Sequence, residues 1–230
     1  MARSNVPESS AHPYSISARC NNKEWFCLPM DEVWQIMENQ LFFLHHAYDA
    51  RILQFVLMNN HFHLMCIFPK GNRAEAMNYF MRESSREIAR RTKRINHIFG
   101  GPHYKCAIQN LNYYYHAYKY IYRNPVQAGL ASRVEEYKYS TLAGLLGRIK
   151  MAIPMPEDQF LFSDVEGAIE WLNTCTPTEE RDVISRGLKK RILEYSPKKS
   201  AQRIDHLEGP PMLRNYAVQT GKEGPAFCCL

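Results

Sequence analysis

Two histidines separated by one residue, His61 and His63, are the pair in this sequence best suited to chemistry. They open a largely apolar run, residues 61–68, that is typical of a β-strand, in which alternate side chains share a face. Both imidazoles would then lie on one face and could chelate a divalent ion, whereas Phe62 would point to the opposite, core-facing side. Two ligands do not complete a metal site, so two ordinary histidines at a strand start are the alternative interpretation.

A tyrosine-rich segment, residues 112–122, is the second candidate. If it is helical, His116, Tyr120 and Asn124 follow one another at intervals of four and form a single stripe. A tyrosine next to a metal-held phosphate can act as a nucleophile, and an asparagine one turn later offers an amide oxygen as a third ligand. The same tyrosines could instead pack as an amphipathic face with their hydroxyls at the rim, or stack on nucleic-acid bases.

Alternating and 3.6-residue patterns predict the elements that must position these residues. The predicted strands and helices of the first part of the chain, in order, are 14–19 (strand), 31–46 (helix), 51–58 and 61–68 (strands), 74–95 (helix), 103–109 (strand), 112–122 (helix) and 140–149 (helix). Ile95 is expected to face inward from the second helix. The third helix is expected to stop before Asn124, because the residue before Pro125 avoids the α region.

This order of elements resembles a ferredoxin-like, split-βαβ antiparallel sheet with helices on one face, so the predicted class is α+β. Ser163 and Glu166 have capping-box spacing ahead of a helix that ends near residue 173. A further helix from Pro177 should reach about residue 195. We therefore expect a main domain over 1–150, a helical extension over 151–195 and a poorly ordered tail over 196–230.

Charge is distributed unevenly along the 230 residues, whose formal net charge is +6. Residues 1–150 carry a net +8, residues 151–180 contain seven acidic and no basic side chains, and residues 181–230 carry a net +5. A basic body indicates a polyanionic partner such as nucleic acid. The acidic stretch could lie across that body and restrain DNA binding, or could simply be a helical cap on the core.

Cysteine usage and hydropathy exclude several classes of protein. The seven cysteines include no CxxC pair, which argues against a cysteine-based zinc site and against a secreted disulfide scaffold. The N-terminal segment contains no apolar signal-peptide region, and no apolar run approaches the length of a membrane span. We therefore expect a cytoplasmic protein with no membrane partner.

The two motifs together resemble one known family. The segment VLMNNHFHLM, followed about sixty residues later by YKYIYRNPVQAGL, is similar to the single-tyrosine HUH transposases, and most similar to their REP-associated tyrosine transposase branch. The shorter segments YSISARCNN and FGGPHYK fit the same branch. The resemblance covers roughly residues 13–147.

This resemblance implies a metal-dependent transposase or endonuclease acting on single-stranded DNA hairpins. It implies that Tyr120 is the nucleophile, forming a 5′-phosphotyrosine, and that His61, His63 and Asn124 hold Mg²⁺ or Mn²⁺. Tyr118 and Tyr122 are rivals in sequence, but each is about 200° around the helix from Tyr120. Neutral imidazoles must ligate, so we expect activity to fall at low pH.

Basic side chains near the tyrosine and along the 74–95 helix are the DNA-binding candidates. They are Lys119, Arg123, Lys105, Arg82, Arg86 and Arg90. The arginines recur every four residues and could follow a phosphate backbone, or could form a solvated face paired with Glu83 and Glu87. His103 and His116 could carry protons, or could be packing residues.

Three other functions remain open at this point. The first is a catalytically inactive hairpin-binding protein, the second an RNA-binding sheet domain, and the third a replication-initiation nuclease that shares the histidine pair. The RNA-binding strand motif is absent, and replication nucleases are usually longer. Relatives of the insertion-sequence type act as dimers and the REP-associated branch can be monomeric, so a homodimer also remains open.

Overall fold

The structure is a computed structural model that describes residues 9–193. Its strands and longer helices, in chain order, are β1 (Tyr14–Arg19), α1 (Met30–Tyr48), β2 (Arg51–Met58), β3 (His61–Ile67), α2 (Arg73–Thr92), β4 (Tyr104–Ala107), α3 (Leu111–Gln127), α4 (Thr141–Leu145), α5 (Gln159–Ser163), α6 (Val165–Asn173) and α7 (Thr178–Gly187). The predicted order of strands and helices through α3 is confirmed. The predicted tail lies outside the described residues.

The four strands form one sheet in the order β2-β3-β1-β4, and every neighbouring pair is antiparallel. β2 and β3 form a hairpin through Asn59-Asn60, as their turn propensity predicts. β1 and β4 join it through connections that contain α1 and α2. The predicted α+β, ferredoxin-like class is confirmed.

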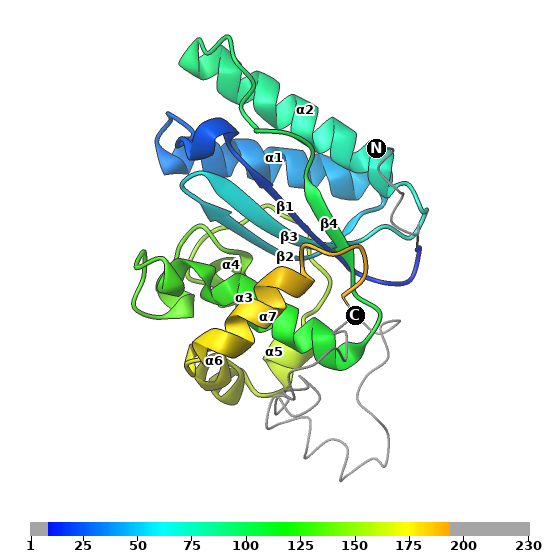
Figure 1. Cartoon of the computed structure of the whole chain (residues 1–230), viewed down its shortest axis with the longest axis vertical. Coiled ribbons are helices and arrows are strands. Elements are labelled where there is room, and N and C mark those ends of the chain that lie inside the picture. The colour runs from blue at the N-terminus through cyan, green and yellow to red at the C-terminus, as the bar shows by residue number, and fades with distance from the viewer. Residues whose placement is uncertain (1–8, 194–230) are drawn as a thin grey trace.

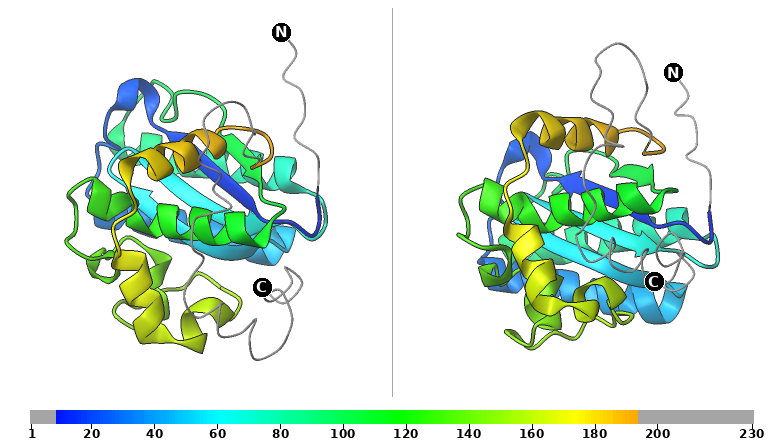
Figure 2. Two further views of the ribbon diagram at one scale, coloured as in Figure 1. Left: turned by 60° about the horizontal axis from the view of Figure 1, so that its bottom comes forward. Right: turned by 90° about the horizontal axis from the view of Figure 1, so that it is seen from below.

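Helices cover both faces of the sheet (Figure 1). α1 and α2 lie on one face, and α3 lies on the other with the C-terminal helices α5, α6 and α7 beside it (Figures 1 and 2). The expectation that helices would cover one face only was wrong. Both faces carry apolar side chains, so each face needs a helical layer to exclude water.

Alternation along β3 divides the molecule into two cores. Phe62, Leu64 and Cys66 are fully buried in the core beneath α1 and α2. Met65 and Ile67 belong to the second core, between the sheet and α3. His61 and His63 share this second face by strand periodicity, as predicted from the sequence.

Helix α2 ends earlier than its sequence pattern predicts. Lys93 adopts a left-handed conformation with φ 55° directly after Thr92, and its N–H donates to the carbonyl of Ala89. This closes the last turn and directs the chain away from the helix axis. Ile95, expected to be inward-facing, is therefore fully exposed.

Helix α3 does the opposite and continues past Pro125 to Gln127. The proline cannot donate to the carbonyl of Ile121, but the Asn124 side-chain nitrogen lies 3.4 Å from that oxygen and 2.9 Å from the carbonyl of Tyr120. Pro125 is itself buried. Packing and this local substitute donor outweigh the tendency of a residue before proline to leave the helix.

The C-terminal extension also differs in detail from expectation. α6 begins one residue later than the predicted cap: Asp164, not Ser163, accepts the hydrogen bond from the Gly167 N–H. α7 ends at Gly187 rather than near residue 195. Within the described residues, no helix is both long enough and apolar enough to cross a membrane.

Candidate active site

His61 and His63 lie side by side on β3, with their ring centroids 5.2 Å apart. In the sheet register His61 is opposite Arg19 and His63 is opposite Ser17. The Nδ1 atom of His61 is 2.7 Å from the side-chain oxygen of Asn60, in the hairpin turn. Because this oxygen is an acceptor, the ring proton sits on Nδ1, and Nε2 keeps its free lone pair. This arrangement is usual for a metal-binding histidine.

Both imidazoles are neutral at physiological pH. Burial, together with the charge of Arg19, lowers the pKa of His61 to about 4. Burial, followed by the charges of His61 and Arg19, lowers the pKa of His63 to about 3. A neutral imidazole is the form that ligates a metal, so the two residues are in the protonation state that a site of this kind needs.

α3 places Tyr120 against this histidine pair. Its ring centroid lies 6.0 Å from that of His63, with the rings nearly perpendicular. Tyr120 is half-buried. Its hydroxyl donates to the Oγ atom of Ser185 on α7, at 3.2 Å. The strand pair and the tyrosine, far apart in the chain, are therefore brought together as predicted.

The neighbouring tyrosines of α3 have structural partners instead. Tyr118 is fully buried and donates to the Asp158 carboxylate at 2.7 Å. Tyr122 is buried and its hydroxyl is 3.1 Å from the Thr141 hydroxyl. Each lies two residues from Tyr120, about 200° around the helix, so neither shares its face of α3. Of the three, Tyr120 is the tyrosine whose ring lies beside His63.

Asn124 lies one turn beyond Tyr120 and is half-buried. Its amide nitrogen is held by the carbonyls of Tyr120 and Ile121, so its side-chain oxygen is the atom available for a ligand. The described residues contain no cluster of three histidine, cysteine or carboxylate ligands. A donor set of two imidazoles and one amide oxygen would suit Mn²⁺ better than Mg²⁺.

Two residues of this site escaped sequence reasoning. Arg19 lies on the histidine face because β1 pairs with β3, and Ser185 contacts Tyr120 because α7 packs against α3. Both contacts depend on tertiary pairing between segments with no shared motif. The only local signal for Arg19 is its position at the end of an alternating strand.

Lys119 and Arg123 were expected to contact the DNA strand, but both are buried beneath α6. The Lys119 ammonium lies 4.7 Å from the ring centroid of Trp171, and burial, followed by the charge of Arg123, lowers its pKa to about 8. Arg123 donates to the carbonyls of Leu172 and Asn173 at the C-terminus of α6. Here they hold the extension against α3, because a helix C-terminus attracts cations.

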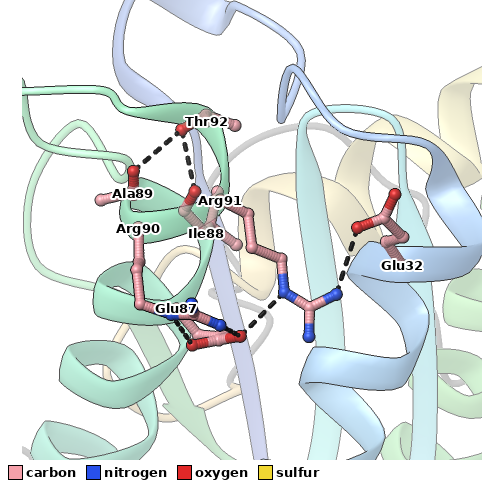
Figure 3. Close-up of polar contacts among 7 residues, drawn as sticks. All are labelled: Glu32, Glu87, Ile88, Ala89, Arg90, Arg91 and Thr92. Atoms are coloured by element: carbon pink, nitrogen blue, oxygen red, sulfur yellow. Dashed lines mark hydrogen bonds and ion pairs between the residues drawn. The ribbon is translucent and has the colours of Figure 1, made fainter.

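The α2 arginines are exposed, as a DNA-binding surface requires, but each has an acidic neighbour. Arg82 and Arg86 pair with Glu83, while Arg90 pairs with Glu87. Glu87 also pairs with Arg91, which reaches Glu32 on α1 (Figure 3). The surface therefore has a positive excess, with part of it used to join the two helices.

The remaining candidates lie away from Tyr120 or are buried. Lys105 pairs with Ile16, whose side chain belongs to the core beneath α1 and α2, so Lys105 is on the face opposite the histidines. His116 is buried, and burial, with the nearby Lys119 charge, lowers its pKa to about 4. Burial likewise lowers the pKa of His103 to about 4.

Fold and site together define an α+β protein with a histidine pair on the central sheet and a tyrosine presented by the helix above it. No family model and no curated protein sequence matches this chain. Among solved structures, the fold is similar to that of the REP-associated tyrosine transposase bound to a REP hairpin. The TM-score is 0.56 at 18% sequence identity, and the match covers 69% of this chain and 93% of that one.

Proposed function

We propose that this protein is a metal-dependent single-stranded DNA transposase or endonuclease that cleaves and rejoins DNA at hairpins. The observation that carries the proposal is the position of Tyr120 beside His63. It is made in a fold similar to that of a hairpin-bound tyrosine transposase. The basic body of the chain and the exposed α2 arginines support a polyanionic substrate.

The reaction follows from the nucleophile. The Tyr120 oxygen attacks the scissile phosphorus, a bond from phosphorus to the tyrosine oxygen forms, and the bond to the 3′ oxygen breaks. The tyrosine proton is released, and the departing 3′ oxygen takes up a proton as a free 3′-OH. The product is a 5′-phosphotyrosine, and attack by another 3′-OH reverses these steps to rejoin the strands without nucleotide input.

His61, His63 and Asn124 would hold a divalent metal ion, and the donor chemistry described above fits one. When bound, the ion would supply charge neutralisation at the attacked phosphate. The chain itself keeps the imidazoles unprotonated by burial, and the α3 backbone engages the Asn124 amide nitrogen, so that the amide oxygen is the atom left for a ligand. The Tyr120 hydroxyl donates to the Ser185 Oγ atom of α7, so this contact breaks if the tyrosine turns toward a bound phosphate.

A strand-transfer gel tests the proposal. Palindromic sequences flanking the gene are labelled as single-stranded oligonucleotides and incubated with wild type or Tyr120→Phe, in Mn²⁺ or EDTA. We expect a covalent protein–DNA band that requires metal and is absent in Tyr120→Phe.

The matched control is Tyr113→Phe, which changes a tyrosine at the start of the same helix. This variant should retain the band. Tight, metal-independent hairpin binding without any adduct would instead support an inactive hairpin-binding protein. A band that persists in Tyr120→Phe would overturn the assignment of the nucleophile.

A further inference from the structure

Tyr104, the first residue of β4, presents an aromatic ring to solvent beside the candidate active site. The side chain is 58% exposed, and within residues 9–193 it makes no ring contact with another aromatic residue. Phe42 and Phe43, the exposed aromatics of α1, are different, because they pack against His46 and Tyr79. A large, unpartnered ring on a structured strand is a natural surface for a planar ligand.

The strand register places this ring on the histidine face. Ser17 of β1 pairs with His63 on one side and with Tyr104 on the other. Residues paired across antiparallel strands point to the same face, so the imidazole and the phenol ring project from the same surface. They are separated by two strand spacings, about 10 Å. The side chain between the imidazole and the phenol ring is that of Ser17, which is small.

Helix α7 leaves this part of the sheet open. It contacts β4 at Cys106, whose Sγ is 3.7 Å from the Gly187 carbonyl, on the same face as Tyr104 but further along the strand. The extension thus covers Tyr120 through Ser185 while Tyr104 remains exposed. A DNA strand bound on this face could therefore contact the Tyr104 ring without displacing any helix of the second core.

A positive charge lies next to the same surface. Arg19 follows Ser17 at strand spacing, is paired with His61 and is exposed. Within the described residues it forms no ion pair with a carboxylate, in contrast to the α2 arginines.

We propose that Tyr104 and Arg19 form a subsite for the unpaired nucleotide flanking the scissile phosphate, with the base stacked on Tyr104 and its phosphate held by Arg19. The subsite rests on the proposed function, since it serves the strand that Tyr120 attacks. Stacking on a tyrosine tolerates any base, so this subsite orients the strand rather than reading its sequence.

Fluorescence of 2-aminopurine tests this assignment. Hairpins from the palindromes flanking the gene carry short unpaired tails, with 2-aminopurine at one tail position per oligonucleotide. We expect wild type to quench the probe at one position, and Tyr104→Ala to abolish that quenching. Affinity for the tailed hairpin should fall about tenfold, the loss expected for one base–aromatic stack, while affinity for a tailless hairpin stays unchanged.

Three variants complete the design. Tyr104→Phe keeps the ring and should retain quenching and affinity. Phe42→Ala, an exposed aromatic on α1, should match wild type. Arg19→Gln should reduce the salt dependence of binding to the tailed hairpin by one phosphate contact, a slope change of about 0.7.

Two results would contradict the inference, and they are distinguishable. Quenching and tail affinity that survive in Tyr104→Ala would overturn the subsite alone, leaving hairpin binding intact. A wild-type protein that binds neither the tailed nor the tailless hairpin would overturn the proposed function, and the subsite with it.

Discussion

Three tyrosines spaced two residues apart on one helix have three different environments. Tyr118 and Tyr122 are buried, and each has a hydrogen-bond partner for its hydroxyl in the core. Tyr120 is half-buried beside His63. Helical rotation between them, about 200° for every two residues, separates the functional face from the packing face. The same phenol group therefore stabilises the core at Tyr118 and Tyr122 and is a candidate nucleophile at Tyr120.

Ser185→Ala should make Tyr120 more reactive toward DNA. The substitution removes the acceptor that now holds the tyrosine hydroxyl, so the side chain no longer has to break this hydrogen bond to turn toward the phosphate. A net hydrogen bond of this kind changes the rate of adduct formation by about two- to tenfold. Single-turnover gels measure the rate. Thr178→Ala, also on α7 but exposed, is the control, and a slower reaction in Ser185→Ala would contradict the prediction.

Buried His116 should make the protein less stable in mild acid. Its pKa is about 4 in the folded state and about 6.5 when unfolded, so between these values the unfolded chain alone binds the proton. Its contribution to stability is intact above pH 6.5 and is lost as the pH falls toward 4. Between pH 7 and pH 5 the unfolding free energy should fall in both proteins. The fall should be about 1 to 2 kcal/mol smaller in His116→Gln than in wild type.

Urea unfolding at the two pH values measures this difference. His97→Gln, at an exposed position, should keep the wild-type pH dependence. Equal losses in wild type and His116→Gln would show that His116 has the same pKa in the folded and unfolded protein, which contradicts the effect expected of its burial.

At the scale of elements, strand β3 and helices α2 and α3 each divide their side chains between two surroundings. Alternation along β3 sends Phe62 into one core and His63 toward the other face. On α2, most of the buried residues are apolar and the outward arginines form ion pairs. Exposed pairs of this kind add little to stability, which leaves the arginines available to exchange a carboxylate for a phosphate.

Arg86→Gln and Arg90→Gln should each weaken hairpin binding in a salt-dependent way. Each removes one cation from α2, so the slope of log affinity against log salt should become shallower by about 0.7 to 0.9 per phosphate contact. Fluorescence anisotropy over a salt series measures the slope. Arg133→Gln removes an arginine that is likewise ion-paired, beyond α3, and should leave the slope unchanged. If all three variants behave alike, α2 is a solvated face rather than a DNA surface.

In the molecule as a whole, the extension is part of the structural body and not an appended unit. Phe160, Leu161 and Leu172 are buried in the second core, and the ring of Phe160 lies 5.0 Å from that of Tyr115. The extension also buries Lys119 and Arg123. Its contact with Arg123 is made by the backbone carbonyls of α6, whereas its acidic side chains Glu166 and Glu170 are exposed.

Deleting residues 151–230 should therefore destabilise the remaining chain. The tyrosine face of α3 would lose its apolar cover, and exposed aromatic surface of this size favours a loosely packed or aggregating state. We expect the truncated protein to bind ANS and to melt without a cooperative transition, whereas the full chain should melt cooperatively, as followed by circular dichroism. Cooperative melting near the wild-type temperature would show instead that the extension is dispensable for folding.

The sequence by itself determined the strands, the order of elements and the candidate catalytic set. Alternation places His61 and His63 on one strand face, and four-residue spacing places Tyr120 and Asn124 on one helix face. These are properties of local backbone geometry, so periodicity reveals them. The family resemblance predicted that the two motifs belong together, and the fold brings His63 and Tyr120 into contact.

Only the tertiary structure decided which side chains the rest of the molecule covers. Lys119 and Arg123 look like surface cations in sequence but lie beneath α6, and Pro125 looks like a helix stop but lies inside α3. Arg19 and Tyr104 join the histidine face through strand register alone. Burial and register depend on contacts between distant segments, and a local pattern carries no information about which segment will pack against it.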